Sequence, residues 1–478
     1  MILLGDLMQQ AGSFAGLEIA GITADSRQVS PGYLFAALPG HSTDGRWFIP
    51  DAVARGASAV LAPIGTAWPP GVPPRPMIQD PEPRRRLALW AAALAGPQPS
   101  IVVPITGTNG KTSTAEFLRQ IWAFAGRRAA SLGTLGLTAP GFDPGPGLTT
   151  PDPVGLADIM ARLKRARVEH VAMEASSHGL AQFRLDGIMP AAAGFTNLTR
   201  DHLDYHGTLS AYRDAKLRLF AALLPARAPA VINAGIDSDT RAALGEIARE
   251  RPLDLRRVGE EGDAIRVKRV IARPEGQIID LAHPVRSIPL PLPGRFQADN
   301  ALLAAGLAMA LGDADALDRL PHLTGVRGRL ERAAQLPNGA AAYVDYAHTP
   351  DALERLLSAL RPHTAGRLFV VFGAGGDRDR GKRPLMGAAA ARFADRVIVT
   401  DDNPRTEDPA IIRREVLAGC PGAQEIGGRA QAIAAALNAL APGDVLAVAG
   451  KGHEQGQIIG NTVVPFDDVQ VIRELAGL

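Results

Sequence analysis

A glycine-rich run with a lysine stands directly after an apolar segment at residues 101–105. Its glycines let the backbone wrap closely around an anion, so that successive N–H groups and the start of a following helix can bind phosphate oxygens. Lys111 adds a positive charge for the β- and γ-phosphates, and the hydroxyl of Thr112 can ligate Mg²⁺. We therefore predict a nucleotide site here, with a helix beginning near Ser113. The residues of this phosphate loop are Gly107, Thr108, Asn109, Gly110, Lys111, Thr112 and Ser113.

The loop is a shortened form of the usual pattern. That pattern places four residues between its first glycine and Gly-Lys-Ser/Thr, whereas only Thr108 and Asn109 separate Gly107 from Gly110. The alternative is a glycine-rich turn that binds nothing. The apolar strand before the loop and the helix predicted after it favour the phosphate site.

Two more groups of polar residues follow predicted strands. Glu174 comes directly after the apolar run 170–173, and the segment 196–207, which contains two histidines and two aspartates, follows the run 191–195. In open α/β sheets ligands collect at the carboxyl ends of the strands. We therefore expect Glu174 to hold a second Mg²⁺ near the phosphate loop, and His202 to reach a metal or a phosphate. By residue type alone, Glu174 could equally be an exposed loop acid.

Lys216 lies on a predicted helix that follows this segment, in the run Tyr212-Arg213-Asp214-Ala215-Lys216. Lysines on helices are most often solvated surface charges. Composition alone therefore favours an exposed Lys216 over a functional one.

The strands and helices that must position these groups can be predicted from the N-terminus onward, starting with short apolar segments. Apolar segments at 19–22, 33–37 and 59–62 are typical of strands, and the arginine- and alanine-rich segment 81–96 predicts a helix.

From residue 101 on, strand-like apolar runs alternate with amphipathic segments, as in a mostly parallel sheet with crossover helices. Residues 254–292 differ, because they alternate and are rich in β-branched residues, which predicts an antiparallel appendage followed by a helix at 300–311. The strand–helix alternation starts again after about residue 326. The predicted strands are 101–105, 170–173, 191–195, 230–233, 341–345, 368–372, 396–400 and 445–449.

The length of 478 residues is too great for one ordinary core and favours about three domains. Together with the alternation, it predicts an α/β protein with domains at 1–97, 98–326 and 327–478.

Composition excludes several classes of function. The 51 basic and 49 acidic residues leave a net charge of +2, without the basic surface that a nucleic-acid-binding protein needs. The single cysteine, Cys420, cannot form an internal disulfide and is expected to be a small apolar packing residue in a reducing compartment. The first residues lack the basic region of a signal peptide, and no run approaches the roughly 20 apolar residues of a membrane span. We expect a cytoplasmic protein.

Taken in order, these motifs resemble the Mur ligase family, and within it the ligases that add diaminopimelate. The likeness extends from about Asp25 to Asp467, and many short motifs in the right order are more specific than any one of them. The segments that carry it are Asp25-Ser26-Arg27, 41–46, the phosphate loop, Thr149-Thr150-Pro151, 174–179, 201–207, 345–350, 375–378, 402–405 and 450–454.

The resemblance implies a three-domain architecture and a reaction. An N-terminal domain would bind the uridine diphosphate, a central P-loop ATPase-like parallel sheet would hold ATP, and a C-terminal Rossmann-like domain would bind an amino acid. The implied enzyme joins meso-diaminopimelate to UDP-MurNAc-L-Ala-D-Glu through an acyl-phosphate, in cytoplasmic peptidoglycan precursor synthesis. Its partners would be these small molecules and ATP, with no nucleic acid, and the chain would be a monomer. Because ATP would touch two domains, closure should precede chemistry.

The resemblance also assigns roles to residues. The lysine matching Lys216 is carbamylated in this family, which converts a cation into a carboxylate-like anion that can ligate Mg²⁺. The implied metal ligands are Thr112, Glu174 and Lys216 as its carbamate. The implied catalytic residues are Lys111, Glu174, His202 and Lys216. Further ATP contacts are implied for Asn300, Arg329 and Asp345. For UDP-MurNAc-dipeptide, the residues implied for the uridine nucleotide are Ser26, His41, Ser42 and Thr43, and those implied for the MurNAc-peptide are Thr149, Thr150, Ser176, Gln182 and Arg184.

The resemblance places the incoming amino acid at the tetrapeptide 402–405. Meso-diaminopimelate is lysine with an extra carboxylate at its far end, and a guanidinium pairs with a carboxylate bidentately. Family members that add lysine lack the arginine that matches Arg405, where a buried guanidinium without a partner would cost several kcal/mol. A strand-end turn without a ligand would also explain Asn-Pro. The implied residues are Arg378, Asp402, Asn403, Pro404, Arg405, Gly450 and Glu454.

Two positions depart from the family pattern, and three other functions compete with this one. Ser113 replaces a commoner threonine, and Leu148 stands where an asparagine is often found, which puts a substrate contact at 148 in doubt. The rivals are a folylpolyglutamate-synthetase-like ligase, a nucleotide switch that forms no bond, and a chain whose motifs are remnants of the fold.

Overall fold

The computed structural model describes residues 1–8, 14–40, 43–143, 147 and 149–478. The chain divides into two compact units. Unit 1 comprises residues 1–258 and 303–314, and unit 2 comprises residues 259–302 and 315–478. The boundaries expected at 97/98 and 326/327 divide the chain differently and stay a prediction.

The first part of unit 1 contains a parallel sheet in the order β3-β4-β5-β6. Alternate residues of β4 and β5 enter two separate cores, one on each face, because side chains alternate along a strand. The single strand expected at 19–22 is wrong. The chain forms two strands there, because the N–H of Ala20 hydrogen-bonds to Gly32 O and does not continue the strand pairing of the residues before it. The elements are β1 (Ile2–Leu3), α1 (Leu4–Leu7), β2 (Glu18–Ile19), β3 (Gly21–Thr23), β4 (Tyr33–Ala36), α2 (Ile49–Ala54), β5 (Ala59–Pro63), β6 (Met77–Asp80) and α3 (Pro83–Ala95).

The second part of unit 1 is built on strands in the order β13-β12-β11-β7-β10-β8-β9. All neighbours are parallel except β8 and β9. The core on one face includes side chains of α5 and α9, whereas α4 packs against β7, β8 and β10 on the other face. The elements are β7 (Ile101–Thr106), α4 (Lys111–Phe124), β8 (Ala129–Gly133), β9 (Gly136–Thr138), α5 (Pro153–Arg165), β10 (His170–Glu174), α6 (Ser177–Ala181), β11 (Ala193–Phe195), α7 (Leu203–His206), α8 (Leu209–Arg218), β12 (Pro229–Asn233), α9 (Ser238–Glu250) and β13 (Asp254–Gly259).

The segment 254–292 is only partly the antiparallel appendage that its alternation predicts. Strand β13 pairs with β12 in parallel, and the antiparallel ladder comprises β14 (Ile265–Arg273), β15 (Gly276–His283) and β16 (Val285–Leu290). Helix α10 (Arg295–Ala310) begins five residues before the expected start at 300.

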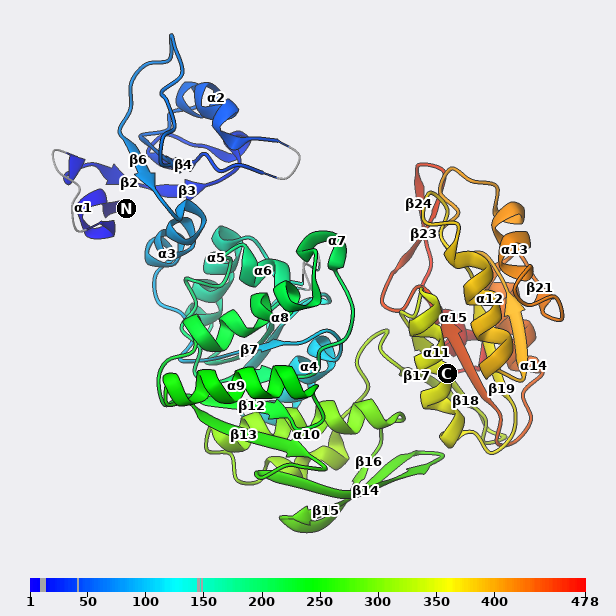
Figure 1. The fold of residues 1–478 in the computed structure, drawn as a ribbon. Helices are drawn as coiled ribbons and strands as arrows, with labels where there is room; N and C mark the ends of the chain where they lie inside the picture. Colours follow the sequence, from blue (N-terminus) through cyan, green and yellow to red (C-terminus); the bar gives the residue numbers. More distant parts are fainter. Residues whose placement is uncertain (9–13, 41–42, 144–146, 148) are drawn as a thin grey trace. The chain divides into compact units, whose positions relative to one another are not determined.

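Unit 2 contains a six-stranded sheet, in the order β17-β18-β22-β19-β20-β21. Its strands belong to the C-terminal part of the chain (Figure 1). Only β17 is antiparallel to its neighbour. Helices α11, α12 and α13 bury apolar side chains on one face, and α14 and α15 do so on the other, which is a doubly wound arrangement. The elements are β17 (Glu331–Gln335), β18 (Ala341–Asp345), α11 (Pro350–Leu360), β19 (Leu368–Phe372), α12 (Lys382–Phe393), β20 (Arg396–Val399), α13 (Pro409–Leu417), β21 (Gln424–Glu425), α14 (Arg429–Asn438), β22 (Val445–Ala449), β23 (Gly456–Ile459), β24 (Thr462–Pro465) and α15 (Asp468–Leu475).

Two expectations drawn from the composition can be compared with the structure. Cys420 is buried in the core under α12 and α13, as predicted for an apolar packing residue, and burial raises the pKa of its thiol to about 11. Among the helices that the structure describes, none combines the length and the apolar character needed to cross a bilayer.

Candidate active site

The phosphate loop joins β7 to α4 through two glycines with positive φ. Gly107 has φ +138°, and a Cβ there would lie 1.9 Å from Thr196 Oγ1, so that only glycine fits. Gly110 has φ +84° and caps α4. The helix begins at Lys111, two residues before the predicted start, so the loop leads directly into a helix N-terminus, where an anion is favoured.

The segment that follows β11 holds this loop in place. Thr108 N donates to Asn197 O at 2.8 Å, and Asn109 N donates to Asn197 Oδ1 at 2.9 Å. Thr196 Oγ1 donates to Asn109 O at 2.6 Å. Because β11 lies next to β7 in the sheet, the two strand ends form one rigid edge.

Two lysines converge on a single carbonyl oxygen of the loop. Lys111 Nζ and Lys216 Nζ donate to Gly107 O at 3.0 and 2.7 Å. Lys216 is 1% exposed and lies over the ring of Tyr212, with Nζ 4.3 Å from the ring centre. Burial, and next the charge of Lys111, lowers the pKa of Lys216 to about 6. Composition favoured an exposed Lys216, but the structure buries it beside the phosphate loop.

Glu174 is buried at the carboxyl end of β10, so that the exposed loop acid considered for this position is excluded. Its Oε1 accepts a hydrogen bond from Thr112 Oγ1 at 2.9 Å and another from Thr134 N at 2.8 Å. Glu174 therefore lies beside the phosphate loop, as expected, whereas its role as a ligand of Mg²⁺ stays a prediction. Thr134 was not predicted, because nothing in its local sequence links it to a residue 40 positions away.

His202 lies at the edge of this region, with 49% of its side chain exposed. It has φ +50° and precedes α7, and its ring centre is 4.9 Å from that of His178. Burial is the main cause that lowers the pKa of His178 and of His206, whose Nε2 lies 3.0 Å from Ser177 Oγ. The predicted contact of His202 with a metal or phosphate stays a prediction.

Two of the three expected metal ligands, Thr112 and Glu174, suit Mg²⁺ chemically. The Thr112 hydroxyl and the Glu174 carboxylate are already within 2.9 Å, and both are hard oxygen donors. Among the described residues, no group of three or more histidines, cysteines and acids is placed to hold a metal. The role of Lys216 as a carbamylated ligand stays a prediction.

Most residues expected to bind the muramoyl peptide form one connected group beside Glu174. Thr150 Oγ1 is 3.0 Å from Ser176 Oγ, and Arg184 Nη1 donates to Thr150 O at 2.8 Å. Arg184 also donates to Gln182 Oε1 at 2.8 Å, while Thr149 Oγ1 lies 3.0 Å from Thr134 Oγ1. The structure thus brings together five predicted residues that span 35 positions of the sequence.

The expected uridine contacts lie in the first part of unit 1. Ser26 is buried and hydrogen-bonds to the carboxylate of Asp51, whose pKa this bond lowers. Thr43 O accepts from Gly40 N at 2.8 Å. His41 and Ser42, like position 148, lie outside the described residues.

Three residues expected to contact ATP lie close together in unit 2. Gln297 connects two of them, since its Oε1 accepts from Asn300 Nδ2 at 3.3 Å and its Nε2 donates to Arg329 O at 3.3 Å. Asp345 accepts from Leu330 N at 2.7 Å, and burial raises the pKa of this carboxyl. Gln297 was not predicted.

The residues expected to bind the amino acid surround the carboxyl ends of β20 and β22. Arg405 has φ +51°, and its Nη1 donates to Gly376 O at 2.7 Å. The arginine is half-buried and already has one hydrogen-bond partner, so the cost expected for a buried, unpaired guanidinium is reduced.

The neighbours of Arg405 differ in burial. Asp402 and Asn403 are buried, and a Cβ on Gly450 would lie 2.4 Å from Asp402 Oδ2, so these two strand ends are in close contact. Asn403 Nδ2 donates to Glu454 Oε2 at 2.9 Å. Pro404 is also buried, whereas Arg378 is exposed.

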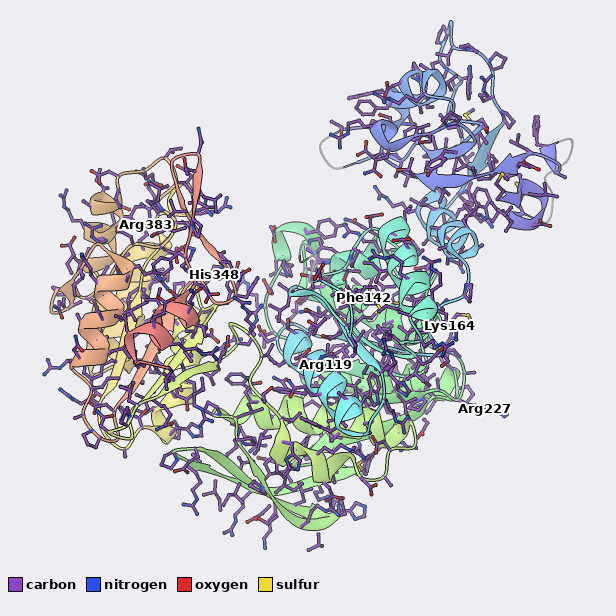
Figure 2. All side chains as sticks on the ribbon, turned by 180° about the vertical axis from the view of Figure 1, so that it is seen from behind. Arg119, Phe142, Lys164, Arg227, His348 and Arg383 are labelled. Carbon is purple, nitrogen blue, oxygen red and sulfur yellow. The ribbon has the colours of Figure 1, made fainter. Side chains whose placement is uncertain are left out.

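Arg383 of α12, labelled in Figure 2, supports the loop that Arg405 contacts. It is fully buried and donates to Glu407 Oε1 at 2.8 Å and to Gly375 O at 3.2 Å. Glu407 in turn accepts from Asp377 N at 2.6 Å. Sequence patterns gave no signal for this ion pair.

The phosphate loop and the polar groups beside it define the class of this protein. A glycine-rich loop stands between a parallel strand and a helix, with a lysine, a hydroxyl and a carboxylate at the same edge of the sheet. These are the features of a phosphate-loop nucleotide-binding protein.

Comparison with known proteins gives the family. Three family models match: the Mur ligase family catalytic domain at residues 18–81, the Mur ligase middle domain at 105–308, and the Mur ligase glutamate ligase domain at 328–452. The UDP-N-acetylmuramoyl-L-alanyl-D-glutamate–2,6-diaminopimelate ligase of Caulobacter vibrioides is 54% identical, over 96% of this chain and 96% of its own. The ligase of the same name from Rhizobium meliloti is 52% identical, over 98% and 96%.

A solved structure agrees. A UDP-N-acetylmuramoyl-L-alanyl-D-glutamate–2,6-diaminopimelate ligase superposes with a TM-score of 0.75 at 32% identity, covering 100% of this chain and 99% of that one. The chain belongs to the Mur ligase family, and its α/β fold is the three-domain architecture of that family.

Proposed function

We propose that this chain joins meso-diaminopimelate to UDP-MurNAc-L-Ala-D-Glu, with ATP converted to ADP and phosphate. The relatives that share half of its residues over nearly the full length carry this activity in their names. The observation that carries the choice of amino acid is Arg405. One guanidinium N–H donates to Gly376 O, and no other acceptor of the guanidinium lies among the described residues, so the remaining N–H groups can bind a carboxylate.

The reaction has two steps. The γ-carboxylate of D-glutamate attacks the γ-phosphorus of ATP, the bond to the β-phosphate oxygen breaks, and an acyl-phosphate and ADP result. The amino group of diaminopimelate then attacks the acyl carbon and loses a proton, an amide forms, and phosphate leaves with the electrons of the broken C–O bond.

The phosphate loop supports the first step by position and charge. The N-terminus of α4 and Lys111 would bind the phosphates, and the hydrogen bonds between the loop and residues Thr196 and Asn197 keep the loop in one conformation before ATP arrives. Thr112, Glu174 and carbamylated Lys216 would hold Mg²⁺, which neutralises the repulsion between carboxylate and triphosphate.

Burial prepares Lys216 for its modification. Carbamylation requires a neutral amine, and a pKa of about 6 leaves most of the Lys216 amine neutral at pH 7. The carbamylated side chain would be an anion. It would attract the positive charge of Lys111, which an unmodified, charged Lys216 would repel.

The remaining expected residues keep their proposed roles. The connected group Thr149, Thr150, Ser176, Gln182 and Arg184 would bind the muramoyl peptide, since it adjoins Glu174 and offers hydroxyl, amide and guanidinium groups. Ser26, His41, Ser42 and Thr43 would bind the uridine nucleotide. Asn300, Arg329 and Asp345 would contact ATP, and His202 would reach a metal or phosphate. The reducing compartment favoured by the lone cysteine and the use of ATP support a cytoplasmic location, where the chain would make peptidoglycan precursors as a monomer.

A competition assay tests the proposal. The protein is incubated with UDP-MurNAc-L-Ala-D-Glu, ATP, Mg²⁺ and equal amounts of meso-diaminopimelate and L-lysine, and the product is weighed by mass spectrometry. We expect the diaminopimelate adduct together with ADP. A predominant lysine adduct would refute the specificity, and ATP binding without an amide product would support a nucleotide switch. Amide formation only with a folate and glutamate would support the folylpolyglutamate-synthetase-like alternative.

A further inference from the structure

Lys451 is a fully buried lysine at the carboxyl end of β22. Its Nζ donates to Asn403 Oδ1 at 3.1 Å, to Glu454 Oε2 at 3.2 Å and to Gly456 O at 2.6 Å. All three donors of the ammonium therefore have acceptors. A buried ammonium destabilises the fold unless acceptors pair with it. A charged Lys451 therefore needs these three contacts.

The contacts of Lys451 orient the carboxylate of Glu454. Oε2 accepts from both Lys451 and Asn403, at 3.2 and 2.9 Å. Within the part of the chain that the structure describes, Oε1 has no hydrogen-bond partner, and 35% of the side chain is exposed. One oxygen is thus held from inside the fold, on a side chain that is partly exposed.

The same ammonium joins the two segments that carry the proposed amino-acid site. Asn403 Oδ1 accepts from Lys451 and also from Ile458 N, at 3.0 Å. Directly beyond Asn403, Arg405 N donates to Ile458 O at 3.0 Å and Arg405 O accepts from Gly460 N at 2.7 Å. The backbone of Arg405 is therefore held against β23, whose start Lys451 fixes through Gly456 O.

We propose that Lys451 is a positioning residue for the incoming amino acid: it holds Glu454 so that Oε1 can accept the distal ammonium, while Asn403 is held beside Arg405. This proposal rests on the proposed function, because it assumes that the substrate has a distal ammonium and a distal carboxylate. Lys451 would act through Glu454 and Asn403 and would not touch the reacting atoms.

A role in folding alone predicts different kinetics. A lysine that only stabilises unit 2 would lower stability when replaced but would leave the KM for diaminopimelate unchanged in the folded fraction. A positioning role predicts that the KM for diaminopimelate rises while the KM for ATP stays nearly constant.

The test replaces Lys451 with methionine, which has a similar length and no charge. For Lys451→Met we expect the KM for diaminopimelate to rise about 10- to 100-fold, as for the loss of a charged hydrogen bond, and the KM for ATP to change less than about threefold. Lys268→Met, at an exposed position of β14, is the matched control and should change neither value. An unchanged KM for diaminopimelate in folded Lys451→Met would overturn the proposal.

A double-mutant cycle tests whether Lys451 acts through Glu454. If it does, the losses in kcat/KM for diaminopimelate from Lys451→Met and Glu454→Gln should combine to clearly less than their product, and the remaining loss from Lys451→Met is the part that Asn403 carries. Losses that multiply in the double variant would contradict this. Lys451→Gln serves in both experiments if the methionine variant does not fold.

The wild-type assay separates the two proposals. If the wild-type protein does not incorporate diaminopimelate, the proposed function fails. If it does, and the Lys451 variants behave like the control, only the role of Lys451 fails.

Discussion

Thr112 Oγ1 donates a hydrogen bond to Glu174 Oε1 at 2.9 Å, across 62 positions of the sequence. The parallel pairing of β7 with β10 places Glu174 opposite Ile105, so that the phosphate loop and the carboxylate leave the sheet at the same level. A shift of one residue in this register would point Glu174 to the other face of the sheet. The proposed metal site thus depends on strand register as much as on the residues themselves.

Replacing Glu174 by glutamine should impair the response to Mg²⁺. Glutamine keeps the size and can still accept from Thr112, but it removes the charge that a divalent cation needs. We expect kcat to fall about 100-fold or more, and half-maximal activity to require more Mg²⁺. ADP release measured against Mg²⁺ concentration checks this, with Glu250→Gln at an exposed position of α9 as the control. An unchanged Mg²⁺ dependence would exclude Glu174 as a ligand.

Replacing Lys216 by alanine should remove activity that small carboxylates can restore. The variant opens a buried space beside Gly107 O, in which formate or acetate can stand in for the carbamate. We expect activity to fall at least about 100-fold and to recover in part with added formate, whereas the wild type gains nothing. Lys216→Arg keeps a cation that does not form a carbamate and should stay inactive. An active arginine variant would show that no carbamate is needed.

Arg405→Lys should damage the use of diaminopimelate selectively. Lysine keeps the charge but loses the two parallel N–H donors that match a carboxylate. We expect the KM for diaminopimelate to rise about tenfold or more, with a change below about threefold in the KM for ATP. Steady-state kinetics with each substrate varied in turn measure both values, and equal losses would contradict the assigned role.

The ion pair of Arg383 and Glu407 should make stability depend on pH. The hydrogen bonds from Arg383 lower the pKa of Glu407 from 4.5 to about 2. A carboxyl group with a lowered folded-state pKa stabilises the fold above its unfolded pKa and loses this contribution as pH falls through the folded value. We therefore expect Glu407→Gln to be less stable than the wild type at pH 7, and the difference to shrink between pH 4.5 and about 2.

Urea midpoints at several pH values, in the absence of ligands, measure this difference. Glu275→Gln, at an exposed position between β14 and β15, should match the wild type throughout. A difference between Glu407→Gln and the wild type that stays constant with pH would show that the carboxylate charge is not involved.

Much of the fold could be predicted because it depends on local patterns. The strands Ala341–Asp345, Leu368–Phe372 and Val445–Ala449 match their predicted bounds, since a continuous apolar run fits a strand buried on both faces. Short strands, and the choice of the strand with which each one pairs, were harder to predict. The chain divides at Ala20 and pairs β13 in parallel because of hydrogen bonds to distant strands, which no local pattern records.

By itself, the sequence determined the phosphate loop, since two glycines, a lysine and a hydroxyl at fixed spacing need only one turn of backbone to meet a phosphate. It also determined that Glu174 and the tetrapeptide 402–405 follow strands. Only the tertiary structure decided that Lys216 is buried against Gly107 and that Lys451 fixes Glu454. The burial and pairing of a charged side chain depend on which strands are neighbours and in what register, and this is settled by packing over the whole sheet.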